Sequence, residues 1–307
     1  MQSYQPDPAS AWERGVGLLR GTAVAAVLVS TLMVTNLCQV SSVVLRPFSL
    51  RAFRRVNRAC AQCWWGLCVM CSRYVNGVRM IFTGDDVPRR ENAIVVANHQ
   101  QMPDIVALMC FGWDKGRLGD MKYFIKASLR HVPGMGWGLS FLDALFLQRN
   151  WEADRGAIEN TFGKFVRERI PVWIVSFVEG TRITPSKQAR SVEYAQRHDL
   201  PALDAVLLPR TKGFVAAVNA LRGHVTAVYD VTIAYPGGIP TLWQYLKGWV
   251  SEVHVHVRRV PVADLPTDAE ALGNRLVIWF QEKDVLLKGF QRSGAFPSAV
   301  TVGGILG

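Results

Sequence analysis

Acidic residues are scarce in this sequence relative to basic ones. The 307 residues include 24 Asp and Glu against 35 Lys and Arg, which gives a formal net charge of +11 at pH 7. This balance favours anionic partners, and phospholipid head groups and nucleic acid are the common classes. The chain carries no nucleic-acid reading motif, whereas half of its residues are hydrophobic and ten are Trp. We therefore expect a lipid bilayer as a partner and no nucleic acid.

Two common catalytic motifs are also missing. The chain contains neither the G-x-S-x-G turn of serine hydrolases nor the G-x-x-x-x-G-K-[ST] loop that holds nucleotide phosphates. GMGWG at residues 134–138 is rich in glycine, but it follows Pro133 and does not join a strand directly to a helix, so we predict a tight turn. Without a covalent nucleophile, a base that activates a substrate hydroxyl is the simplest remaining chemistry.

The cysteines and paired histidines lack the spacing of a metal site. The six cysteines are Cys38, Cys60, Cys63, Cys68, Cys71 and Cys110. Four of them form two C-x-x-C pairs separated by only four residues, whereas zinc ribbons need a long loop between the pairs. We predict that they are small apolar residues in a helix that contacts the membrane. VHVHV at 253–257 places His254 and His256 on one strand face, which could be a metal pair, but no third ligand is evident. We predict an exposed strand face and no metal.

Charged residues are absent from 21–45. About 20 apolar residues cross the roughly 30 Å hydrocarbon core, so these 25 residues predict a retained membrane helix. A cleaved signal peptide is the alternative, but its apolar region is usually about 7–15 residues long and no clear cleavage site follows here. Arginines follow at once, at Arg46, Arg51, Arg54, Arg55 and Arg58. The positive-inside rule then predicts an integral membrane protein whose remaining chain faces the cytoplasm, at the inner membrane if it is bacterial.

The rest of the chain divides by composition. We expect a polar tail over 1–20, a membrane-embedded segment over 21–75, a catalytic domain over 80–289 and a C-terminal tail over 290–307. Within the second segment, 59–72 is uncharged but short for a span and predicts an interfacial or re-entrant helix.

Short apolar runs alternate with amphipathic stretches after residue 80. The expected strands are 92–97, 121–126, 143–148, 172–177, 205–208 and 225–233. The expected helices are 103–112, 151–168, 185–197, 211–222 and 267–288. This alternation predicts an α/β sandwich with a largely parallel central sheet flanked by helices. In such sheets, functional sites gather where strands end and helices begin.

His99 follows one of these strands, and Asp104 lies in the first turn of the next helix. Pro103 suits the first position of that helix, and a carboxylate in the first turn is favoured by the helix dipole. Because the chain turns between them, the two side chains can come within hydrogen-bond distance. Asp104 would then orient His99 as a general base. The alternative is that Asp104 caps the helix and His99 is a turn residue.

Cationic residues follow other expected strands. In WIVSFVEGTRITPSK at 173–187, Gly180 permits close backbone approach, and Arg182 has the planar fork that suits phosphate, with Thr181 and Lys187 beside it. A surface turn with a solvated arginine is the alternative. The further cations at expected strand ends are Arg149, Arg210 and Lys212. Their convergence would suit a phosphate-bearing substrate with a hydroxyl group.

These blocks together resemble those of the glycerolipid acyltransferases, the lysophosphatidic acid acyltransferase family. Its N-H-x4-D motif matches Asn98, His99 and Asp104, and its E-G-T-R block matches 179–182. The intermediate arginine block is similar to FLQR, which ends at Arg149, and PRTKGF at 209–214 resembles the lysocardiolipin and lysophospholipid acyltransferase branch. One position departs from the family, because Val178 stands where proline is usual, and this puts the pose of the glutamate in doubt.

The resemblance implies an acyltransferase-like α/β sandwich behind N-terminal membrane helices. It implies acyl transfer from acyl-CoA or acyl-carrier protein, as co-substrate, to the hydroxyl of lysophosphatidic acid, with no cofactor. His99 would be the base and Asp104 its orienting acid. The implied substrate-binding residues are Asn98, Arg149, Glu179, Gly180, Thr181, Arg182, Arg210 and Lys212. A lysophospholipid with another head group and a non-catalytic membrane lipid-binding protein are the alternatives.

Overall fold

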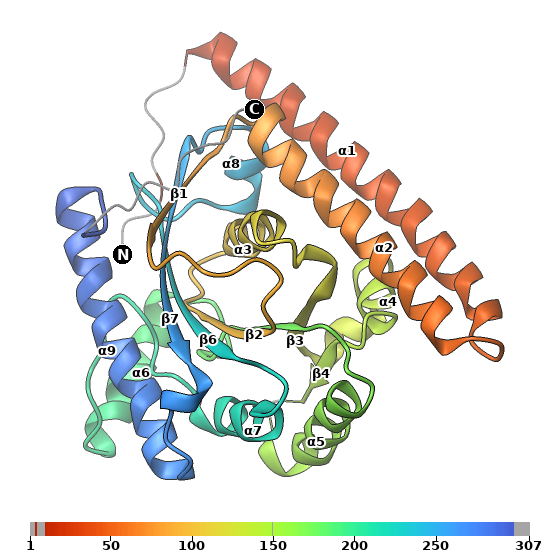
Figure 1. The fold of residues 1–307 in the computed structure, drawn as a ribbon. Coiled ribbons are helices and arrows are strands. Elements are labelled where there is room, and N and C mark those ends of the chain that lie inside the picture. Colours follow the sequence, from red (N-terminus) through yellow and green to blue (C-terminus); the bar gives the residue numbers. More distant parts are fainter. Residues whose placement is uncertain (1–3, 5–9, 149, 298–307) are drawn as a thin grey trace.

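The computed structural model describes residues 4, 10–148 and 150–297. A seven-stranded sheet has the order β1-β7-β6-β2-β5-β3-β4, and every neighbouring pair is parallel except β6 with β7 (Figure 1). Its strands are β1 (Arg79–Gly84), β2 (Ala93–Ala97), β3 (Met121–Lys126), β4 (Leu145–Leu147), β5 (Trp173–Ser176), β6 (Ala227–Ala234) and β7 (Glu252–Pro261). The helices are α1 (Ala11–Ser41), α2 (Leu50–Met70), α3 (Pro103–Asp114), α4 (Met135–Ser140), α5 (Trp151–Arg167), α6 (Pro185–Arg197), α7 (Thr211–Leu221), α8 (Leu242–Leu246) and α9 (Ala269–Ser293). The predicted α/β class with a largely parallel sheet is therefore confirmed.

Strand β2 shows why the sheet is covered on both faces. All five residues of its AIVVA sequence are buried. Val95 packs into one hydrophobic core, which it shares with α2 and α3, whereas Ile94 and Val96 pack into a second core shared with α5, α7 and α9. Successive side chains of a strand point to opposite faces, so an unbroken apolar run is the pattern of a strand with helices on both sides.

The α1–α2 hairpin differs from the predicted membrane segment. Helix α1 begins at Ala11, ten residues before the expected start, because Ser10 and Glu13 form a capping box. Most of the arginine-rich segment and of 59–72 forms one helix, α2, which starts at Leu50 and continues as a π-helix over Cys71–Val75. Its buried residues include Asn57, Ala61, Trp65 and Val69, which repeat every four positions and therefore line the helix face that packs on the domain.

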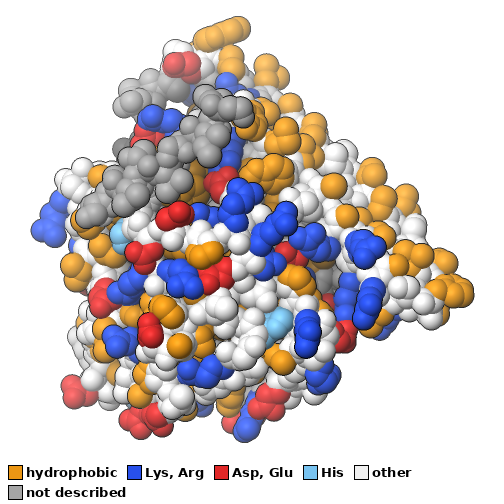
Figure 2. All heavy atoms as spheres, in the orientation of Figure 1, with side chains coloured by type: hydrophobic (Ala, Val, Ile, Leu, Met, Phe, Trp, Pro, Cys, Tyr) orange, Lys and Arg blue, Asp and Glu red, His pale blue; other side chains and the backbone are white. Residues whose placement is uncertain are grey.

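Helix α1 contacts the globular domain near both of its ends. Near its start, Gly17 lies against the Trp249 side chain. Its middle packs on the other helix of the hairpin, where the Leu28 carbonyl accepts a hydrogen bond from Trp64 Nε1 at 3.0 Å. Near its end, Gln39 Nε2 donates to the Gly138 carbonyl at 3.3 Å. The outer side of the hairpin carries exposed apolar side chains (Figure 2), and Ala11–Leu45 is the one described helical segment long and apolar enough to cross a membrane.

Several other predictions about single elements are wrong. The run 205–208 is not a strand, because its backbone N–H groups bond side chains: Ala205 donates to Asp284 and Leu207 to Glu179. GMGWG contributes most of α4, and only Gly134, at φ +79°, has the conformation of a turn. The histidine face of β7 is not exposed, because the rings of Phe290 and Phe296 cover it.

Candidate active site

The His99–Asp104 pair lies where β2 ends and α3 begins. His99 is the second residue after the strand, and Asp104 is the second residue of the helix, after Pro103. The His99 Nδ1 atom and Asp104 Oδ2 are 3.0 Å apart. This contact makes Nδ1 the donor and leaves the lone pair on Nε2, which is the tautomer that a general base requires. The His99 side chain is 13% exposed, so the imidazole is not sealed from solvent.

Asp104 is held by four hydrogen bonds. Oδ2 also accepts from the backbone N–H groups of Gln100 and Gln101, at 2.6 and 2.8 Å, and Oδ1 accepts from the Tyr235 hydroxyl at 2.6 Å. The residue is fully buried. The carboxylate therefore makes both kinds of contact considered from the sequence: it accepts hydrogen bonds from the backbone of the turn, and it contacts the imidazole.

Two side chains that fix this pair were missed by the sequence reasoning. The Phe177 ring stacks on the His99 imidazole, with centroids 4.0 Å apart and planes 19° apart. Tyr235 follows β6, as Phe177 follows β5, and both strands are direct neighbours of β2. Each is an aromatic residue immediately after a buried strand, which is the only signal the sequence offered for them.

Glu179 binds the backbone that carries His99. Its Oε1 accepts the His99 backbone N–H at 2.8 Å, and its Oε2 accepts that of Leu207 at 3.2 Å. The Ile183 N–H donates to the His99 carbonyl at 3.0 Å, so Glu179 and the residue after the E-G-T-R block together hold the histidine backbone on both sides. Val178 is buried, and its carbonyl accepts from the Arg210 N–H at 2.8 Å, so the missing proline leaves the glutamate in a well-defined place.

Three cationic side chains lie near the E-G-T-R block at 179–182. Arg182 is exposed and donates to the Gln101 side chain, two residues from His99. Gly180 has φ +71°, a conformation that favours glycine, and a Cβ there would lie 3.0 Å from Arg210 Nε, so the Arg210 side chain packs closely on this backbone. Lys187 Nζ donates to Thr181 Oγ1 at 2.6 Å and to the Arg182 carbonyl.

The other expected substrate contacts have different positions. Asn98 is fully buried, and its amide pairs with both backbone groups of Ile233, so it joins β2 to β6 and does not face a substrate. Lys212 is exposed on the first turn of α7. Arg149 lies outside the described residues. A cation that sequence reasoning missed, Lys126, is exposed at the carboxyl end of β3, on the sheet edge that carries His99.

Comparisons with known proteins agree with this geometry. A family model described as Acyltransferase matches residues 79–236, and one described as Acyltransferase C-terminus matches 244–303. A probable 1-acyl-sn-glycerol-3-phosphate acyltransferase 5 of Arabidopsis thaliana is 35% identical over 289 residues, which are 93% of this chain and 77% of the relative. The human 1-acyl-sn-glycerol-3-phosphate acyltransferase gamma is 35% identical over 89% of this chain and 74% of its own. The chain belongs to the glycerolipid acyltransferase family.

Two further relatives extend the comparison. Lysocardiolipin acyltransferase 1 of Danio rerio is 36% identical over 75% of this chain and 60% of its own length. The crystal structure of the 1-acyl-sn-glycerophosphate acyltransferase of Thermotoga maritima covers 92% of this acyltransferase, and 99% of its own chain is matched, with a TM-score of 0.50 and 20% identity. That likeness shows the shared fold. The chain is thus an O-acyltransferase, as the sequence predicted.

The buried carboxyl of Glu179 gives this acyltransferase a testable pH dependence. Burial raises its pKa from the ordinary 4.5 to about 8, although the two backbone donors favour the charged form. The folded state therefore keeps a proton that the unfolded state has released between these pH values. The associated stability is fully present below about pH 4.5 and is lost as pH rises through about 8.

Glu179→Gln removes this titration, because an amide stays neutral. We expect the free energy of unfolding of the wild type, relative to the variant, to fall by up to about 1.4 kcal/mol per pH unit between these limits. Denaturant titrations of both proteins at several pH values measure the difference. Parallel pH profiles would show that the Glu179 carboxyl titrates normally.

Proposed function

We propose that this acyltransferase moves an acyl chain from acyl-CoA or acyl-carrier protein to the free hydroxyl of lysophosphatidic acid, forming phosphatidic acid. The observation that carries the proposal is the His99–Asp104 pair, 3.0 Å apart, beside the cation Arg182 at the carboxyl ends of the strands. The names of the 1-acyl-sn-glycerol-3-phosphate acyltransferase relatives support the same acceptor.

The chemistry needs one base that also returns a proton. His99 Nε2 takes the proton of the acceptor hydroxyl as that oxygen attacks the thioester carbonyl carbon, and Asp104 stabilises the imidazolium that forms. The tetrahedral intermediate collapses with cleavage of the carbon–sulfur bond, and the imidazolium gives its proton to the departing thiolate. The acyl group ends as an ester and the donor as a free thiol, so the histidine is regenerated without a covalent enzyme intermediate.

A thioester-release assay with a panel of lysophospholipids tests the acceptor. Transfer that depends on His99 and is confined to lysophosphatidic acid supports the proposal. His99-dependent transfer to other lysolipids would assign the enzyme to phospholipid remodelling, which the lysocardiolipin acyltransferase relative makes the second candidate. The donor is tested in the same assay by offering acyl-CoA and acyl-carrier protein separately. Failure with both donors would overturn the proposed pair of acyl donors.

Arg182 is our candidate for the phosphate of the acceptor. Its guanidinium is exposed and reaches over the turn that carries His99. Loss of one charge-assisted hydrogen bond costs about 1.5–3 kcal/mol, so Arg182→Ala should raise the acceptor KM by about tenfold to a hundredfold. The donor KM should stay within about twofold, since the donor does not depend on this charge. Arg190→Ala, which removes an exposed arginine of α6, is the matched control. An unchanged acceptor KM in Arg182→Ala would contradict the assignment.

We also propose that the α1–α2 hairpin attaches the enzyme to the cytoplasmic face of a membrane with α1 lengthwise in one leaflet. A helix that spans the bilayer would place its two ends on opposite sides. Here Gly17 and Gln39, near the two ends of α1, contact the same globular domain, so the exposed apolar face of the helix meets lipid along its side.

Single-cysteine labelling separates this arrangement from a spanning helix. Gly15→Cys fits without contact, because a Cβ there has no neighbour within 4 Å, and Arg51 is exposed at the start of α2. With α1 in one leaflet, an impermeant thiol reagent should modify Gly15→Cys and Arg51→Cys from the same side of sealed vesicles. Labelling from opposite sides would establish a spanning helix.

A further inference from the structure

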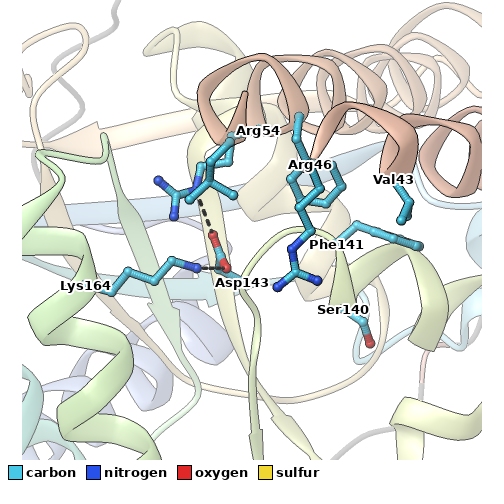
Figure 3. Close-up of a pocket in the computed structure, with 9 residues that line it drawn as sticks. Val43, Arg46, Arg54, Ser140, Phe141, Asp143 and Lys164 are labelled. Atoms are coloured by element: carbon cyan, nitrogen blue, oxygen red, sulfur yellow. Dashed lines mark hydrogen bonds and ion pairs between the residues drawn. The ribbon is translucent and has the colours of Figure 1, made fainter. Parts of the chain in front are cut away.

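A pocket lies between the tip of the α1–α2 hairpin and the edge of the sheet (Figure 3). Its volume is about 190 Å³. Its lining includes Arg46, Arg54, Ser140, Phe141, Asp143 and Lys164. A second hollow of about 380 Å³ shares Ser140, Asp143 and Lys164 with it and adds Arg130. The two therefore form one groove along β4.

This groove is separate from the catalytic pair. Strand β4 is the edge of the sheet and lies three strands from β2, which is roughly 14 Å at the usual strand spacing. Asp143 precedes β4, whereas His99 follows β2, and these strands run in the same direction. None of the residues that contact His99 or Asp104 lines the groove.

The pocket has more positive charge than its own carboxylate neutralises. Lys164 Nζ lies 2.6 Å from Asp143 Oδ1, and Arg54 Nε lies 3.9 Å from Asp143 Oδ2. Arg54 also pairs with Glu168, yet its Nη2 is buried without a hydrogen-bond partner in the described part of the chain. Arg46 extends toward Ser140 and Phe141 and forms no ion pair within residues 10–148 and 150–297. These unused donors suit an anion with several oxygen atoms.

An exposed apolar surface adjoins the charged part. The neighbours of Arg46 at the hairpin tip include Val44 and Phe48, two residues that are 69% and 84% exposed. Figure 2 shows apolar side chains along the hairpin and Lys and Arg side chains on the surface beside it. Cations next to an apolar surface form the pattern that recognises an amphiphile with an anionic head group.

We propose that this pocket binds the phosphate of an anionic phospholipid of the bilayer, whose acyl chains lie beside the hairpin tip. Arg46, Arg54 and Lys164 contact the phosphate oxygens. The bound lipid fixes the hairpin tip at the head-group level and so sets the orientation of the domain on the membrane. This inference rests on the proposed membrane attachment of the hairpin and is independent of the identity of the acceptor.

Binding of the full chain to vesicles of phosphatidylcholine, with or without phosphatidylglycerol, tests the proposal. Phosphatidylglycerol is used because it is not the proposed product. Arg46→Gln with Lys164→Gln should weaken binding to the anionic vesicles by about tenfold more than Arg51→Gln with Arg55→Gln, which removes the same charge from exposed positions outside the groove. Arg46→Gln alone should show part of this excess loss, and the fold should persist because the substitution breaks no described ion pair.

Equal losses in the two double variants would mean that only net charge matters and would overturn the site. Vesicle binding that is unchanged in Arg46→Gln, together with loss of inorganic phosphate binding measured without vesicles, would also overturn it, because the ligand would then be a soluble phosphate compound. Acyl transfer in detergent should be unchanged in Arg46→Gln. Vesicle binding and catalysis are thus measured separately. If the proposed reaction fails, the vesicle-binding measurements still test the lipid site.

Discussion

Replacing His99 by alanine is expected to lower acyl transfer by about a hundredfold to ten-thousandfold while leaving the protein folded. The His99 imidazole contacts the Asp104 carboxylate and is also partly exposed to solvent. Among the described residues, no other titratable side chain at this strand end combines the two. Its backbone N–H and carbonyl remain bonded to Glu179 and Ile183 in the variant, so the turn should keep its shape. The thioester-release rate with saturating donor and acceptor measures the effect.

His198→Ala is the matched control for this loss. His198 is exposed, stacks on Tyr194 and lies at the C-terminal end of α6, whereas His99 follows β2. It should retain wild-type transfer, and both variants should melt within a few degrees of the wild type. If His99→Ala kept substantial activity, the base would have to be sought elsewhere and His99 would be a structural turn residue.

The His99–Asp104 pair could be predicted because its geometry is local. Five residues separate the two, Pro103 begins the helix, and a strand, a turn and a helix start bring the side chains together whatever the rest of the chain does. The contact between Tyr235 and Asp104 could not be predicted in this way, since the residues are 131 positions apart. It depends on β6 being the neighbour of β2, and strand order is not encoded in any local pattern.

The errors share a physical cause as well. The run 205–208 has the composition of a strand, but carboxylates from Glu179 and Asp284 satisfy its backbone donors, so it needs no neighbouring strand. The resemblance to the N-H-x4-D motif implied that Asn98 binds substrate, yet its amide bonds the backbone of β6 at Ile233. Local pattern identified the strand ends where functional groups gather, and packing decided which side chains face the substrate.

The second large effect is expected for Asp104→Asn. The amide oxygen can still accept the N–H groups of Gln100 and Gln101, and the Tyr235 hydroxyl can turn to accept from the new NH₂ group. The fold should therefore persist, with little change in melting temperature. The negative charge that stabilises the imidazolium is lost, however, and we expect transfer to fall by about a hundredfold or more.

Asp104 as a cap and Asp104 as an orienting acid predict different outcomes for this variant. A residue that only tied down the turn would be replaced by asparagine with little loss of activity, because the backbone bonds survive. Asp284→Asn is the matched control: that buried carboxylate also accepts two backbone N–H groups, from Asp204 and Ala205, but contacts no histidine. Near-normal transfer in Asp284→Asn together with a folded, inactive Asp104→Asn would assign the loss to the charge beside His99. Equal activity in the two variants would leave Asp104 with the structural role alone.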